Sequence, residues 1–160
     1  MNKAWAIAAL SLCTLASSAW AADDPQVGRW KLDLVRSKYV TGVLPKSSVA
    51  TVTPFGDDGV SLSVEAVTAD GKPQHIAYKA KYDGTHYPRT ESGAGAVSGQ
   101  TVTLKRIDAH TAERSVYLGE KPGGTERWSV SADGKTRTVT QSGIDLKGKP
   151  INNLQIYVKQ

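Results

Sequence analysis

Apolar and polar residues alternate with a period of two along most of this chain, from Val27 to its C-terminus. Successive side chains of an extended strand point to opposite faces, so this alternation buries one face and leaves the other in water. The clearest runs, given by their apolar members, are Trp30, Leu32, Leu34; Val60, Leu62, Val64, Ala66; Ile76, Tyr78, Ala80, Tyr82; and Leu154, Ile156, Val158. No segment of about ten or more residues in the part after the leader shows the period of an amphipathic helix. The pattern predicts an all-β fold with little or no helix.

Turn signals separate these runs at the spacing of β-hairpins. Asp-Gly pairs, which suit tight hairpin turns, occur at residues 58–59, 70–71, 83–84 and 133–134, and further turn glycines are Gly123, Gly124 and Gly148. About eight to ten short strands joined in this way indicate an antiparallel sandwich or barrel. No linker-like segment divides the chain, so we expect one domain over residues 22–160.

The sequence Ala-Asp-Gly-Lys at residues 69–72 fixes the register of one hairpin. Partners across two strands must share a face, which pairs Leu62 with Tyr78. This pairing needs a three-residue loop in which Thr68 faces Lys72. We therefore expect a type I turn with a left-handed Gly71 in a G1 bulge.

The same four residues recur at 132–135, with Gly134 at the turn, and here two registers are possible. The identical turn would pair Trp128 with Thr138 and line the interior with threonines, which suggests a polar cavity. The alternative pairs Trp128 with Val139 and suggests a filled apolar core. Turn identity favours the first register and apolar matching favours the second.

The N-terminal residues 1–21 are typical of a secretory signal peptide. Lys3 precedes a short apolar core from Ala4 to Ala16, and the sequence Ala19-Trp20-Ala21 predicts cleavage after Ala21. The apolar run is too short to span about 30 Å of hydrocarbon, so no stable membrane anchor is expected. Cys13, the only cysteine, lies in this leader, which leaves no disulfide or thiolate site beyond it. We expect a periplasmic or secreted protein.

Charge and motif content exclude several function classes. The net charge is +5, yet Lys and Arg residues are mixed with acids and form no cluster, which argues against nucleic-acid binding. The three histidines, His75, His86 and His110, lack metal-ligand spacing, so neither a metal nor another cofactor is predicted. No nucleophile motif such as Gly-x-Ser-x-Gly occurs, and no catalytic residue is assigned. The acids without a turn role are Glu65, Glu91, Asp108, Glu113, Glu120 and Glu126.

Four aromatic residues mark the candidate interior. The alternation places Trp30, Tyr78, Tyr82 and Trp128 inward and Tyr157 outward. In a barrel of this size such rings either fill the core or line a pocket for one small ligand. We name the four inward residues as candidate walls of a cavity, and an ordinary packed core stays open as the alternative.

The residues Gly28-Arg29-Trp30, on the first strand of an all-antiparallel chain, resemble the Gly-x-Trp motif of the lipocalins and the wider calycin group. The resemblance implies a single up-and-down β-barrel in which Trp30, preceded by Gly28, closes one end. It also implies a basic residue from a late strand over the Trp30 ring, with Arg127, Arg137 and Lys159 as candidates. Residues 36–48 would form the long first loop that covers the open end.

The function implied by this resemblance is binding of a small apolar or amphipathic molecule in the cell envelope. Two alternatives belong to other classes of protein. One is a protein-interaction module, such as an inhibitor of an envelope enzyme or an assembly factor, that uses a strand edge or a loop. The other is an isomerase or cyclase in which the barrel positions its substrate and which leaves no sequence motif.

Overall fold

A computed structural model describes residues 24–160, and the predicted signal peptide lies outside them. The described residues form eleven strands and contain no helix. The strands are β1 (Gly28–Leu32), β2 (Lys38–Tyr39), β3 (Ser47–Pro54), β4 (Gly59–Val67), β5 (Pro73–Lys81), β6 (Tyr87–Gly93), β7 (Gln100–Arg106), β8 (Thr111–Leu118), β9 (Lys121–Val130), β10 (Thr136–Ile144) and β11 (Pro150–Lys159). No helix within residues 24–160 has the length and apolarity needed to cross a membrane.

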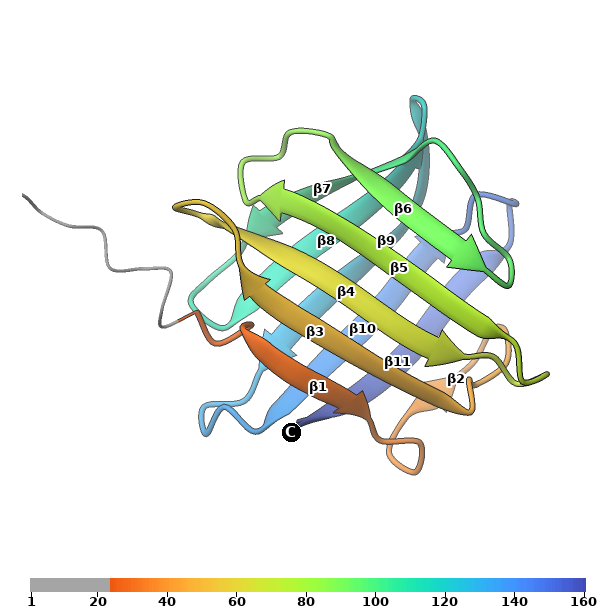
Figure 1. The fold of residues 1–160 in the computed structure, drawn as a ribbon, viewed down its shortest axis with the longest axis horizontal. Coiled ribbons are helices and arrows are strands. Elements are labelled where there is room, and N and C mark those ends of the chain that lie inside the picture. The colour runs from red at the N-terminus through yellow and green to blue at the C-terminus, as the bar shows by residue number, and fades with distance from the viewer. Residues whose placement is uncertain (1–23) are drawn as a thin grey trace, which may run out of the picture.

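All strands except β2 form one closed antiparallel barrel. Each of them pairs with the next along the chain, and β1 pairs with β11 to close the ring. In Figure 1, β1 and β3 to β6 form the near wall and β7 to β11 the far wall. The predicted up-and-down barrel of about eight to ten strands is confirmed, and it is compatible with a calycin-like architecture.

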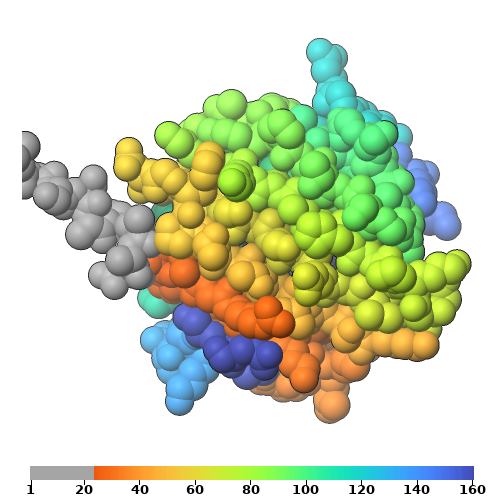
Figure 2. Space-filling model, viewed as in Figure 1, coloured from red at the N-terminus to blue at the C-terminus, as the bar shows by residue number. Residues whose placement is uncertain are grey.

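The ring is closed between the first and last strands of the barrel. Trp30 pairs with Lys159 and Leu32 pairs with Tyr157, and the Gln160 amide donates to the Arg29 carbonyl over 2.9 Å. Figure 2 shows the C-terminal residues lying directly beside β1. The chain therefore leaves no unpaired barrel edge at this seam.

One end of the barrel, which we call the closed end, is sealed around Trp30. It carries the loops 24–27, 55–58, 82–86, 107–110 and 131–135. Trp30 is fully buried, and its Nε1 donates to the Gln26 backbone carbonyl over 3.0 Å. Gln26 is also buried, and its side-chain Nε2 donates to the His110 carbonyl over 2.8 Å. The Lys159 ammonium lies 5.1 Å from the Trp30 ring centroid, so Lys159 is the basic residue over this ring. Gly28, with φ of 146°, leaves room for the Lys159 side chain, because a Cβ on residue 28 would lie 2.6 Å from Lys159 Cε.

The opposite end, which we call the open end, is partly covered by the segment from Asp33 to Lys46. Its two-residue strand β2 pairs with Asn153 and Leu154 of β11. Asn153 Oδ1 accepts hydrogen bonds from the Val40 and Thr41 amides, each over 3.1 Å. The long first loop expected from the resemblance is therefore present, and it is fixed to the last strand rather than free.

The two Ala-Asp-Gly-Lys turns adopt different registers. In the first, Leu62 pairs with Tyr78 and the Thr68 amide donates to the Lys72 carbonyl, as predicted, with Gly71 at φ of 88°. In the second, Trp128 pairs with Val139 and Gly134 has φ of 69°. The register that favours apolar matching is therefore the one adopted.

The prediction for β11 is wrong about which residues face inward. Asn153, Gln155 and Tyr157 are buried, whereas Val158 is 37% exposed. The polar residues face inward because the interior supplies partners for them. The Tyr157 hydroxyl donates to Gln155 Oε1 over 3.2 Å and lies 3.3 Å from the Ser48 hydroxyl.

Candidate functional site

A cavity of about 560 Å³ occupies the half of the barrel nearer the open end. Its mouth lies between the 33–46 segment, through Tyr39, Val43 and Pro45, and the turn at residues 68–70. The volume lies in the range of ordinary small-molecule pockets, about 300–1,000 Å³. The interior is therefore hollow, although the second hairpin has the register that was expected to fill it.

One wall of the cavity is apolar and comes from β3, β4 and β5. Even-numbered positions on these three strands face inward, because the pairs Val52–Leu62 and Leu62–Tyr78 place them on a single face. The apolar residues of these strands that line the cavity are Ala50, Leu62, Val64, Ala66 and Ile76. This wall can accept an apolar surface without desolvating a charge.

The facing wall is polar and comes from β8, β9, β10 and β11. Arg114 Nη2 forms a salt bridge of 2.6 Å with Glu126 Oε1, and both side chains are mostly buried. Glu126 also accepts hydrogen bonds from Gln141 Nε2 over 2.8 Å and Trp128 Nε1 over 3.2 Å. Burial opposes ionisation of Glu126, but the Arg114 charge and these hydrogen bonds hold its pKa below the ordinary value. Glu126 is thus a fully bonded carboxylate.

Arg137 lies on the same polar wall but has no acidic partner. It is only 2% exposed, and no salt bridge among residues 24–160 includes it. Its guanidinium lies 4.6 Å from the Trp128 ring centroid, and its Nε has no hydrogen-bond partner. A cation–π contact offers about 0.5–2 kcal/mol, less than the several kcal/mol that burying an ion costs. Arginine remains protonated even though burial lowers the pKa of Arg137, so this charge lacks full compensation.

A second compartment of about 260 Å³ lies beside the main cavity at the open end. It shares Arg114, Glu126 and Gln141 with that cavity. Two of its other charged groups are buried and paired with each other, since Arg89 binds Glu91 over 2.9 Å and Gln100 Nε2 donates to Glu91 over 2.8 Å. The Arg114–Glu126–Gln141 layer therefore separates two spaces rather than filling one.

The four predicted cavity residues are all buried, but at different levels of the barrel. Trp128 lies on the polar wall of the cavity. Trp30 and Tyr82 pack at the closed end, where Arg106 lies 3.9 Å from the Tyr82 ring and binds Asp24 over 2.8 Å. Tyr78 lies between these levels, with the Arg114 guanidinium 5.5 Å from its ring centroid. Direct ligand contact by these residues stays a prediction.

Sequence reasoning missed the charged residues inside the barrel. Glu91 and Glu126 were not distinguished from exposed acids, and Arg114 received no role. Arg137 was considered only as a cover for Trp30, whereas it lies against Trp128. The signal that could have found Glu126 is parity, because it lies two residues before the inward-facing Trp128 and so shares its face.

The described residues offer no metal site, since none of their His, Cys, Asp and Glu residues gather in groups of three or more. His75 lies 3.0 Å from the Ser63 hydroxyl, and His86 lies 2.9 Å from the Thr101 hydroxyl and packs against the Tyr117 ring. These histidines lie on the outside of the barrel and do not line the cavity. The chemistry of the site therefore comes from the arginine, glutamate, amide and aromatic side chains described above.

Comparisons with known proteins add no family assignment. No protein-family model matches the chain, and no significant match is found among curated proteins. The fold class is thus established by the structure, a closed antiparallel β-barrel with a cavity open at one end.

Proposed function

We propose that this chain is an exported β-barrel protein that binds one small amphipathic molecule inside the barrel, within the cell envelope. The observation that carries the proposal is the two-sided cavity, with an apolar wall on β3 to β5 and a polar wall on β8 to β11. Such a cavity matches a molecule that has one apolar and one polar side. Export rests on the leader-like sequence of residues 1–21.

Two features favour binding over the alternative functions. The barrel strands pair with neighbours on both sides, which leaves little strand edge for a protein partner. The buried carboxylate of the main cavity, Glu126, is held by Arg114 and is poorly suited to act as a general base. The closed barrel and the paired Glu126 therefore favour ligand binding over catalysis and over addition of a partner strand.

The test is a fluorescence titration of the chain lacking residues 1–21 with a hydrophobic naphthalene-sulfonate dye. We expect saturable binding of one dye per barrel. Ala66→Trp fills the cavity from its apolar wall and should abolish binding, whereas Ala77→Trp, on the outer face of the adjacent strand β5, should not. Absence of saturable binding to the unaltered protein, or equal binding by both variants, would contradict the proposal.

A further inference from the structure

We propose that the molecule bound in this cavity is a monoanionic acid, and that its negatively charged group binds Arg137. The inference rests on the proposed function and names the chemical class of its ligand. Three observations support it: the distribution of charge inside the barrel, the contacts of Arg137 and the depth at which Arg137 lies.

The charged side chains within the barrel do not balance. Arg89, Arg114 and Arg137 are the arginines that line the main cavity and the second compartment, and Glu91 and Glu126 are the buried carboxylates of these two spaces. The first two arginines are each bound to one glutamate, at 2.9 Å and 2.6 Å. A single positive charge therefore remains, and a ligand with one negative charge would neutralise it.

The polar atoms left without partners around this charge are hydrogen-bond donors. Buried atoms without a partner include Nε of Arg114 and Nε of Arg137. A group rich in acceptor oxygens, such as a carboxylate, fits these donors, whereas a ligand amine would not.

The position of Arg137 gives the ligand a direction. Arg137 pairs with Val130 and Tyr157 near the inner end of the cavity, directly above the Trp30 level. The apolar lining residues Val64, Ala66 and Val43 lie between that level and the mouth. The acid group would therefore enter first and bind at the bottom, with the apolar part of the molecule extending toward the 33–46 segment.

The test compares two probes, dansyl-labelled undecanoic acid and its methyl ester, by equilibrium fluorescence titration. The unaltered protein should bind the acid about tenfold or more tightly than the ester, since a charge-assisted hydrogen bond is lost with the ester. Arg137→Leu should remove this preference and leave ester affinity within about threefold. Arg127→Leu, the same substitution on the outer face of β9, should retain the preference.

The stability of the variant separates a ligand anchor from a structural role. Replacing an uncompensated buried charge by an apolar side chain should leave the thermal unfolding midpoint of Arg137→Leu unchanged or higher by a few degrees. A large fall in that midpoint would assign Arg137 to the structure instead. If this variant does not fold, a pH titration of the unaltered protein tests the same point. Its preference for the acid over the ester should disappear as the probe carboxylate becomes protonated.

The outcomes for the inference and for the proposed function differ. Equal affinity for acid and ester in the unaltered protein would overturn the acid ligand and leave a binding barrel in place. A preference that survives Arg137→Leu would overturn the role of Arg137. Failure of both probes to bind, together with failure of the naphthalene-sulfonate dye, would overturn the proposed function itself.

Discussion

Arg137 and the Arg114–Glu126 pair lie on the same wall, but the protein depends on them in different ways. Glu126 has three partners, Arg114, Gln141 and Trp128, which come from three strands. Arg137 has an aromatic contact and an unpaired Nε. At the residue scale, removal of Glu126 should therefore damage the fold, whereas removal of Arg137 should damage only binding.

Glu126→Gln should strongly lower the free energy of unfolding. It keeps the shape of the side chain but leaves Arg114 as a second buried arginine without an acid, and breaking a buried pair in this way costs about 3–5 kcal/mol. Urea unfolding followed by circular dichroism measures the change. Glu113→Gln, on the outer face of β8, is the matched control and should shift the free energy by less than about 1 kcal/mol.

The cost of Glu126→Gln should also depend on pH. The folded pKa of Glu126 is below its ordinary value, so its charge stabilises the fold fully above that ordinary value of 4.5. This stabilisation is lost as the pH falls below 4.5 and through the lower folded pKa. The difference between the unaltered protein and Glu126→Gln should therefore shrink in acid, and a difference independent of pH would contradict a role for the Glu126 charge.

The inward aromatic residues could be predicted from the alternation of apolar and polar residues. The inward charged residues could not, because a polar residue in such a pattern is expected to face water. Trp128 and Tyr78 were placed correctly because they lie within apolar runs. On β11 the same logic failed, since Tyr157 and Gln155 are the buried residues. They bond each other and also find partners on other strands, in Ser48 and Tyr39. Polar residues that satisfy one another inside a cavity reverse the pattern that a dry core would impose.

At the scale of elements, the 33–46 segment of the open end is fixed to a strand more than a hundred residues away in the sequence. Asn153 of β11 accepts from the Val40 and Thr41 amides and donates to Gln141 Oε1 over 3.1 Å. One side chain thus connects the cover of the cavity to its polar wall. The Thr41 amide depends on it most, because the Val40 amide also donates to the Asn152 carbonyl over 3.3 Å and a backbone donor without a partner is costly.

Asn153→Ala should release this segment without unfolding the barrel. Loss of net hydrogen bonding of about 1–2 kcal/mol lowers the local opening free energy and should speed amide exchange at Thr41 about tenfold. The acceleration should be smaller at Val40, whose amide keeps the Asn152 carbonyl as an acceptor. Hydrogen exchange measured by NMR tests this, with the β4 amides expected to keep their protection. Asn152→Ala is the control, since this neighbouring residue bonds Thr41 through its backbone amide. Equal acceleration in both variants would contradict the role of the Asn153 side chain.

The two Ala-Asp-Gly-Lys hairpins show what local sequence can and cannot determine. Turn glycines at Gly71 and Gly134 were predictable, and both have positive φ. The register was predictable only where apolar residues flank both strands, as at Leu62 and Tyr78. In the second hairpin the register places Arg137 inward beside Val139, and nothing local to the turn indicates that a buried arginine is acceptable there.

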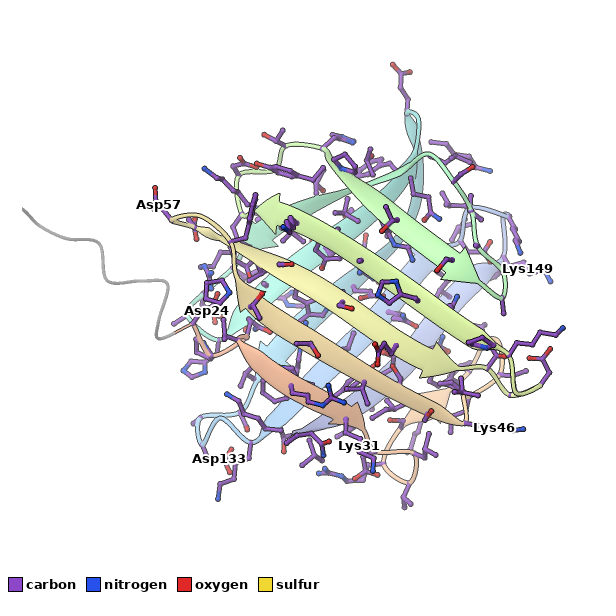
Figure 3. All side chains as sticks on the ribbon, viewed as in Figure 1. Asp24, Lys31, Lys46, Asp57, Asp133 and Lys149 are labelled. Carbon is purple, nitrogen blue, oxygen red and sulfur yellow. The ribbon has the colours of Figure 1, made fainter. Side chains whose placement is uncertain are left out.

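At the scale of the whole molecule, the two ends of the barrel differ in charge. The closed-end loops hold six aspartates and one lysine. The open-end segments 33–46, 68–72, 94–99, 119–120 and 145–149 hold six basic and four acidic residues. Figure 3 shows Asp24, Asp57 and Asp133 at one end, and Lys46 and Lys149 toward the other. This distribution of charge creates an electrostatic field that directs an anion to the mouth and not to the closed end.

Reversal of two charges at the open end should therefore slow binding of an acidic ligand. Lys46→Glu combined with Lys149→Glu should lower the association rate of dansyl-labelled undecanoic acid severalfold in stopped-flow measurements at low salt, and leave its dissociation rate unchanged. Lys105→Glu with Lys135→Glu makes the same change of net charge near the closed end and should have a smaller effect. At about 1 M salt, where the Debye length is about 3 Å, the variants should converge. Equal slowing by both pairs would mean that net charge, rather than its placement around the mouth, governs entry into the barrel.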